Sequence, residues 1–168
     1  MYQKHENSKQ YVVHGLLCNI PPKGMVYNYN TKKHKHYGVV RRSSHRIHQF
    51  WERPLRPEDF LERRKKEIFK QKTEPQFVDL KLQAYRNREW DRRLYGFWFS
   101  NKGEATYITG LHYFYLTHWR LDTGYPDFRI PDMEFFYFLE HCIQDPNCLG
   151  MMELTKRRQG KTVRAGAF

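Results

Sequence analysis

Near its carboxyl end the 168-residue chain reads Met151-Met152-Glu153-Leu154-Thr155-Lys156-Arg157-Arg158-Gln159-Gly160-Lys161-Thr162. A short apolar run over residues 149–154 predicts a buried strand, and a turn and a helix start follow it. This order of elements is typical of a phosphate-binding α/β fold, whose loop pattern is Gly, four residues, then Gly-Lys-Ser/Thr. Thr155 replaces the first glycine, while Gly160-Lys161-Thr162 is intact at the correct spacing.

These residue types suit a triphosphate. Gly160 lets successive backbone N–H groups turn toward an anion at the start of a helix. Lys161 would reach the β- and γ-phosphates, and the Thr162 hydroxyl would bind a Mg²⁺ ion that bridges them. A bare Gly-Lys-Thr also occurs by chance in a basic, solvated loop, so this alternative stays open.

The charge of the chain is unevenly distributed. Residues 1–93 hold 22 basic and 10 acidic residues and account for the whole net charge of +12, whereas residues 94–168 hold 8 of each. This split predicts that the first part binds a polyanion, with nucleic acid as the default, because each neutralised phosphate releases counterions. A solvated basic surface without a partner is the alternative.

Composition excludes several classes of protein. The longest apolar run, near Phe135–Leu139, falls far short of the roughly 20 residues of a membrane span. The first residues contain no apolar core of a secretory signal. Three cysteines cannot all pair, which favours reduced thiols in a cytosol-like compartment.

Local patterns divide the first part of the chain in two. Residues 1–50 carry scattered Gly, Pro and Asn without a sustained period, so we expect them to be loop-rich. Pro57-Glu58-Asp59 predicts a helix start, and the stripe Phe60, Leu61, Ile68 and Phe69 predicts its apolar face. A second helix is expected from Glu74-Pro75 to about Leu94, with Gly96 as its stop and one face formed by Phe77, Leu80, Ala84 and Trp90.

Aromatic residues dominate the second part. The runs that flank Asn101-Lys102-Gly103 predict a β-hairpin over residues 97–109. The aromatic segment 111–119 receives no assignment. Pro131 opens a predicted helix that ends at Asp145-Pro146-Asn147. The aromatic side chains are interpreted mainly as core, with base stacking as the alternative.

The loop Lys156-Arg157-Arg158-Gln159-Gly160-Lys161-Thr162 resembles the deviant phosphate loop of large terminase subunits, the DNA-packaging ATPases of tailed bacteriophages. The resemblance extends over residues 88–168 and is strongest to terminases of the crAss-like group. Its upstream motifs are Tyr107-Ile108-Thr109-Gly110-Leu111-His112-Tyr113-Phe114-Tyr115-Leu116, Trp119, Asp122, Gly124, Pro126, Phe128-Arg129, Asp132 and Phe135-Phe136.

The resemblance implies roles for single residues. Arg129-Ile130-Pro131-Asp132 stands where the family carries an adenine-contacting Arg-x-x-Gln, and an ionised Asp132 accepts hydrogen bonds but cannot donate them. Asp132 could equally charge the helix start, and the two roles can coexist. Arg157 matches an arginine that acts as a cis finger on the γ-phosphate, although adjacent Arg158 is an alternative. Thr155, Arg158 and Gln159 would complete the nucleotide-binding loop.

The resemblance also implies an architecture. The fold class is α/β: the beginning of a P-loop ATPase domain, preceded by a basic helical extension and a β-hairpin. We expect a basic arm over residues 1–56, a basic helical segment over 57–96 and the incomplete ATPase domain over 97–168. The paired carboxylates that position water and the nuclease domain would follow Phe168, so the chain is expected to be an amino-terminal fragment that is inactive alone.

The predicted function is ATP binding, with Mg²⁺, within a viral motor that packages double-stranded DNA into a prohead. The implied partners are DNA, the portal protein, the small terminase subunit and further copies of the chain in a ring, in the host cytoplasm and without a membrane. The alternatives are a non-enzymatic nucleic-acid-binding protein, in which residues 1–93 are the functional part, and a helicase-like P-loop ATPase.

Two further clusters carry weaker signals. His34, His36, His45 and His48 lack cysteines or carboxylates at zinc-finger spacing and are interpreted as part of a titratable basic arm rather than a metal site. Cys142 and Cys148 flank a predicted turn and match no zinc or redox spacing, so we interpret them as thiols of the core or of the helix end.

Overall fold

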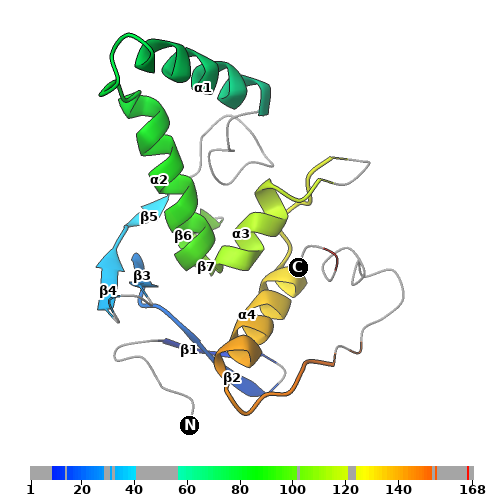
Figure 1. Cartoon of the computed structure of the whole chain (residues 1–168). Helices are drawn as coiled ribbons and strands as arrows, with labels where there is room; N and C mark the ends of the chain where they lie inside the picture. The colour runs from blue at the N-terminus through cyan, green and yellow to red at the C-terminus, as the bar shows by residue number, and fades with distance from the viewer. Residues whose placement is uncertain are drawn as a thin grey trace.

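The computed structural model describes residues 9–13, 15–28, 31, 33–40, 57–101, 103–120, 124–152, 154 and 166. Within these ranges the chain is a mixed α/β protein with seven short strands and four helices (Figure 1). The strands form two separate two-stranded hairpins and one three-stranded sheet. The α/β class expected from the sequence is therefore confirmed.

The amino-terminal part contains strands where the sequence predicted loops. Strands β1 (Lys9–Val13) and β2 (Leu16–Ile20) form one antiparallel hairpin, and β3 (Met25–Asn28) and β4 (Lys33–His36) form another. Strand β5 (Val39–Val40) follows. The loop-rich interpretation is wrong for these residues, because such short strands show little periodicity of their own and depend on packing against distant elements.

Two helices follow as a helical hairpin. Helix α1 (Pro57–Gln71) begins at the predicted proline. Helix α2 (Leu80–Tyr95) begins later than expected, because the Asp79 carboxylate accepts hydrogen bonds from the Lys81 and Leu82 N–H groups at 3.0 and 3.1 Å. Gly96 ends the helix with φ of 68°, as predicted.

The buried faces of α1 and α2 differ from the predicted apolar stripes. Leu61 and Phe69 are exposed, and so are Leu80 and Trp90 on α2. The buried positions on these helices are Glu67, Leu82 and Glu89. The apolar stripes therefore predicted the wrong buried faces of α1 and α2. Two of the three buried side chains are carboxylates held by specific partners, which a hydrophobic pattern does not indicate.

The second half of the chain is built around the predicted hairpin. Strands β6 (Phe97–Asn101) and β7 (Glu104–Ile108) pair antiparallel, and β5 adds to β6 in parallel. The unassigned aromatic segment forms helix α3 (Gly110–Thr117), in which the His112 N–H donates to the Thr109 hydroxyl at the N-cap. Helix α4 (Ile130–Gln144) begins beside Pro131 and ends at Asp145, as predicted.

The hairpin is buried on both faces. Phe97, Phe99 and Ile108 pack with aromatic residues of α3 and α4. The alternate residues Trp98 and Tyr107 point to the other side. There they pack with a second set, contributed by β1, β2, β3 and α4: Val13, Cys18, Ile20, Val26, Met133 and Tyr137. The aromatic side chains thus form core, as expected, and the amino-terminal strands complete it.

Helix α4 contributes to both clusters, since Phe135 and Phe136 join the first and Met133 and Tyr137 the second. None of the helices in the described ranges is both long and apolar enough to cross a bilayer.

Candidate functional site

The predicted phosphate loop lies outside the described residues. This holds for Thr155, Lys156, Arg157, Arg158, Gln159, Gly160, Lys161 and Thr162. His45 and His48 also lie outside, whereas His34 and His36 are on β4.

The segment that precedes this loop, residues 149–154, differs from the prediction. The described residues of segment 149–154 form no strand, and the side chains of Leu149, Met152 and Leu154 are 104%, 85% and 91% exposed. Only Met151 packs against the core. The prediction of a buried strand is therefore wrong at these residues, because an apolar run becomes a buried strand only where neighbouring strands and a covering layer are present.

Arg129 and Asp132, the predicted base-contacting pair, are brought together. The Arg129 Nε donates to Asp132 Oδ2 at 2.8 Å, and Nη2 donates to Oδ1 at 3.2 Å. Such a two-point pairing fixes the plane of the guanidinium. Asp132 is 1% exposed and lies in the first turn of α4, where a carboxylate also interacts favourably with the helix dipole.

Tyr115 of α3 holds the same arginine from another side. Burial lowers the pKa of Arg129, but its hydrogen bonds to Asp132 and Tyr115 and the charges of these groups outweigh the burial and raise it overall. The Arg129 side chain remains 50% exposed. The guanidinium is thus oriented and permanently charged, and its exposed part can contact an anion or the face of a nucleotide base.

A buried histidine packs among the aromatic rings of this region, against Tyr115, Phe128 and Phe136. The His112 ring is fully buried and stacks on Phe136, with the ring centroids 4.7 Å apart and the planes at 14°. Neither ring nitrogen has a hydrogen-bond partner. Burial lowers the pKa of His112 to about 3, so the ring is neutral at physiological pH. His112 is part of the aromatic support of α3 and α4, and with so low a pKa its neutral ring is only a weak base.

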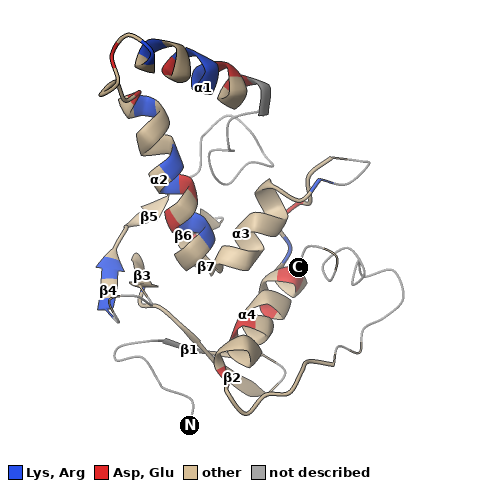
Figure 2. Ribbon diagram, viewed as in Figure 1, with Lys and Arg blue, Asp and Glu red and all other residues tan. Residues whose placement is uncertain are grey.

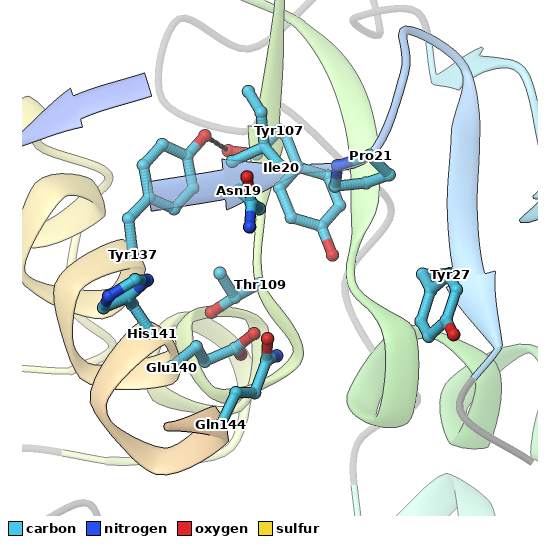
Figure 3. Close-up of a pocket in the computed structure, with 10 residues that line it drawn as sticks. All are labelled: Asn19, Ile20, Pro21, Tyr27, Tyr107, Thr109, Tyr137, Glu140, His141 and Gln144. Carbon is cyan, nitrogen blue, oxygen red and sulfur yellow. Dashed lines mark hydrogen bonds between the residues drawn. The ribbon is translucent and has the colours of Figure 1, made fainter. Parts of the chain in front are cut away.

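A second polar feature is a small pocket of about 30 Å³ between β2, the end of β7 and the last turns of α4 (Figure 3). The Asn19 side chain lines it, with its amide nitrogen on the side of Thr109 and Glu140 and its oxygen at the opposite end. Asn19 Oδ1 is buried without a hydrogen-bond partner. A space of this size holds about two water molecules, which would satisfy such an acceptor.

Glu140 is the carboxylic acid that lines the pocket. Its carboxylate accepts hydrogen bonds from the Thr109 hydroxyl and the Leu111 N–H at the start of α3. Burial raises the pKa of Glu140 to about 7, although these two hydrogen bonds oppose the shift. A carboxyl that titrates near neutrality can accept or release a proton within the pocket.

Sequence reasoning missed this pocket. Thr109 before Gly110 carried a usable N-cap signal. No local sequence pattern could predict that Asn19 and Glu140 line one pocket, because they are 121 positions apart. They share the pocket because β2 packs on α4.

Some of the positive charge of the helical hairpin is neutralised by ion pairs within the hairpin. Residues 57–95 hold 11 Lys and Arg against 8 Asp and Glu, a net charge of +3. Arg64 and Arg86 are bound by the buried Glu67 at 2.5 and 3.2 Å. Figure 2 shows Lys and Arg on α1, α2 and β4, whereas α4 carries only acidic charges. The exposed cations of this surface include Lys65, Lys72 and Lys81.

No match was found when the chain was compared with protein-family models, with curated proteins and with solved structures.

Proposed function

We propose that the chain forms the ATP-binding part of a viral DNA-packaging motor, the large terminase subunit. In this proposal Gly160 permits the phosphate loop, Lys161 binds the phosphates and Thr162 binds Mg²⁺. Arg157, or Arg158 beside it, stabilises charge on the γ-phosphate, and Thr155 and Gln159 complete the loop. ATP hydrolysis would drive double-stranded DNA into a prohead in the host cytoplasm, with the portal protein, the small terminase subunit and a ring of copies as partners.

The observation that carries the proposal is the Arg129–Asp132 pair. Its two residues occupy the positions that the resemblance to terminases assigns to a base contact, and the guanidinium is both anchored and half-exposed. Because Asp132 is engaged by Arg129, the arginine is the member of the pair with surface available to a base. Tyr115, which is hydrogen-bonded to Arg129, belongs to the motifs that carry the resemblance.

Nucleotide binding tests the proposal directly. We expect a fluorescent ATP analogue to bind the chain in the presence of Mg²⁺, and Lys161→Ala to weaken binding about tenfold or more, since a charged hydrogen bond to phosphate contributes roughly 1.5–3 kcal/mol. Lys72→Ala removes the same charge from the exposed helical hairpin and should leave binding unchanged. Equal affinity of the Lys161→Ala variant and the wild type would refute the proposal.

The base contact has its own test. Inorganic triphosphate competes for the phosphate loop but offers no base. Arg129→Ala should therefore weaken binding of ATP more than binding of triphosphate. Equal weakening of both ligands would assign Arg129 to the phosphates or to the fold rather than to the base.

The second candidate is a nucleic-acid-binding module without ATPase activity, which the exposed Lys65, Lys72 and Lys81 favour. Binding of a double-stranded oligonucleotide should then weaken steeply with salt. Each Lys→Ala change at these positions should lower the slope of log K against log salt by about 1. If DNA binding is retained while the ATP analogue does not bind, this second function replaces the first.

A further inference from the structure

Two of the three cysteines meet at the carboxyl end of α4. Cys142 lies in the last turn of the helix, which ends where the Asp145 N–H donates to His141 O at 3.1 Å. The chain then reverses, because the Cys148 N–H donates to Asp145 O at 3.0 Å. The Asn147 N–H donates to the Asp145 carboxylate at 2.9 Å and closes the turn from within. Cys148 is thereby returned to the side of the helix that carries Cys142.

The two thiols are in hydrogen-bond contact. Cys142 is hydrogen-bonded to the Cys148 sulfur, and the Cys148 thiol donates to Gly150 O at 3.2 Å. Both side chains are half-buried, so small reagents can reach them, whereas Cys18 on β2 is 1% exposed. Sulfur atoms in such contact need only small side-chain rotations to reach a bond of about 2.05 Å.

We propose that Cys142 and Cys148 form an oxidation site that a hydroperoxide converts into an intramolecular disulfide. One of the two sulfurs, as thiolate, attacks one peroxide oxygen and the O–O bond breaks. Its cysteine becomes a sulfenic acid, and the other oxygen leaves as water or an alcohol after it takes a proton. The second sulfur loses its proton and attacks the first, the S–O bond breaks, and the departing hydroxide takes up this proton and leaves as water. Two thiols are oxidised to one disulfide, and the peroxide is reduced by the same two electrons.

Burial affects the protonation of Cys142. It raises the pKa of Cys142 to about 11, and the hydrogen bond to Cys148 acts in the same direction. Cys142 therefore keeps its proton near pH 7 and donates it toward the neighbouring sulfur. Because the thiolate and not the thiol attacks, formation of the bridge requires that this proton be lost.

The bond would have a local structural consequence. It would tie the last turn of α4 to the exposed segment that begins at Leu149. This consequence is independent of any nucleotide chemistry, so failure of ATP binding leaves the oxidation site intact and its own test decides it.

Oxidation of the purified chain with hydrogen peroxide tests the inference. Free thiols, counted after denaturation, should fall from three to one. The intact mass should fall by two hydrogen atoms, and digestion should give one cross-linked peptide pair that contains Cys142 and Cys148. Cys18→Ser is the matched control and should form the same bridge.

Cys142→Ser and Cys148→Ser each remove one partner and should abolish the bridge. In each variant the remaining cysteine of the pair should stop at a sulfenic acid, which a dimedone probe traps. Retention of three free thiols, a bridge that includes Cys18, or bridges between two chains at low protein concentration would each overturn the proposal.

Discussion

The Tyr113 hydroxyl on α3 donates a hydrogen bond of 2.7 Å to Oε2 of Glu89 on α2, and both residues are buried. This contact joins the helical hairpin to the aromatic core. Because Glu89 is 6% exposed, its carboxylate depends on protein partners rather than on water.

We expect Tyr113→Phe to lower the free energy of unfolding by about 1–3 kcal/mol, since it leaves a buried carboxylate without its hydroxyl donor. Urea denaturation measures the change. In a double-mutant cycle with Glu89→Gln, the double variant should lose at least about 0.5 kcal/mol less free energy of unfolding than the sum of the losses of the two single variants. Fully additive effects would show that the two side chains do not stabilise one another.

His112 should make the protein sensitive to acid. Its pKa is lowered from 6.5 to about 3 by burial, so below pH 6.5 the unfolded chain takes up a proton that the folded chain refuses. The free energy of unfolding therefore falls as the pH decreases from about 6.5 toward 3. His112→Phe keeps a ring in the stack with Phe136 and removes the titration. The stability of this variant relative to the wild type should rise steadily below pH 6.5, and a pH-independent difference would contradict the burial of a neutral ring.

Glu140 should make the protein less stable as the pH rises, which is opposite to the effect of His112. Burial raises its pKa from 4.5 to about 7, so its contribution to stability is complete below pH 4.5 and is lost as the pH rises through 7. Between pH 5 and 8, the free energy of unfolding of the Glu140→Gln variant should rise relative to that of the wild type by up to about 2 kcal/mol. Thr109→Val removes a hydroxyl donor to the carboxylate and should raise the pKa of Glu140 further, measurable by NMR titration. If the Glu140→Gln variant keeps the pH dependence of the wild type, the shift belongs to another group.

Two glycines allow the backbone to pass closely between α2 and α3. A Cβ on Gly110 would lie 2.0 Å from Arg93 O, and a Cβ on Gly96 would lie 2.1 Å from Ile108 O. Since neither neighbouring atom belongs to a flexible side chain, Gly110→Ala and Gly96→Ala should destabilise the fold severely, by about 3 kcal/mol or more. Gly150→Ala is the control, because nothing lies within 4 Å of its Cβ. Equal melting temperatures for all three variants would contradict this close approach.

Local signals were sufficient for several elements. Pro57 marked the start of α1, Gly96 the end of α2 and Pro131 the start of α4, because proline fixes its own φ and glycine adopts a positive φ without strain. The hairpin around Gly103 was equally local. For α2, the Asp79 carboxylate determined the start, although Glu74-Pro75 offered a plausible alternative five residues earlier.

Tertiary contacts decided the rest. Cys18 and Ile20 become strand residues by packing with Met133 and Tyr137, more than a hundred positions away. The same cause explains why Asn19 and Glu140 gave no sign of a shared pocket. Arg129 and Asp132 were assigned to one site by the resemblance, and in the structure they pair because they are three positions apart at a helix start, where one turn joins them.

The parallel pairing of β5 with β6 joins the two halves of the chain. Val39 and Val40 are in register with Trp98 and Phe99, so the basic amino-terminal half is fastened by backbone hydrogen bonds to the central strand of the aromatic half. Residues 39–40 and residues 97–101 therefore belong to one sheet, although more than fifty positions separate them in the sequence.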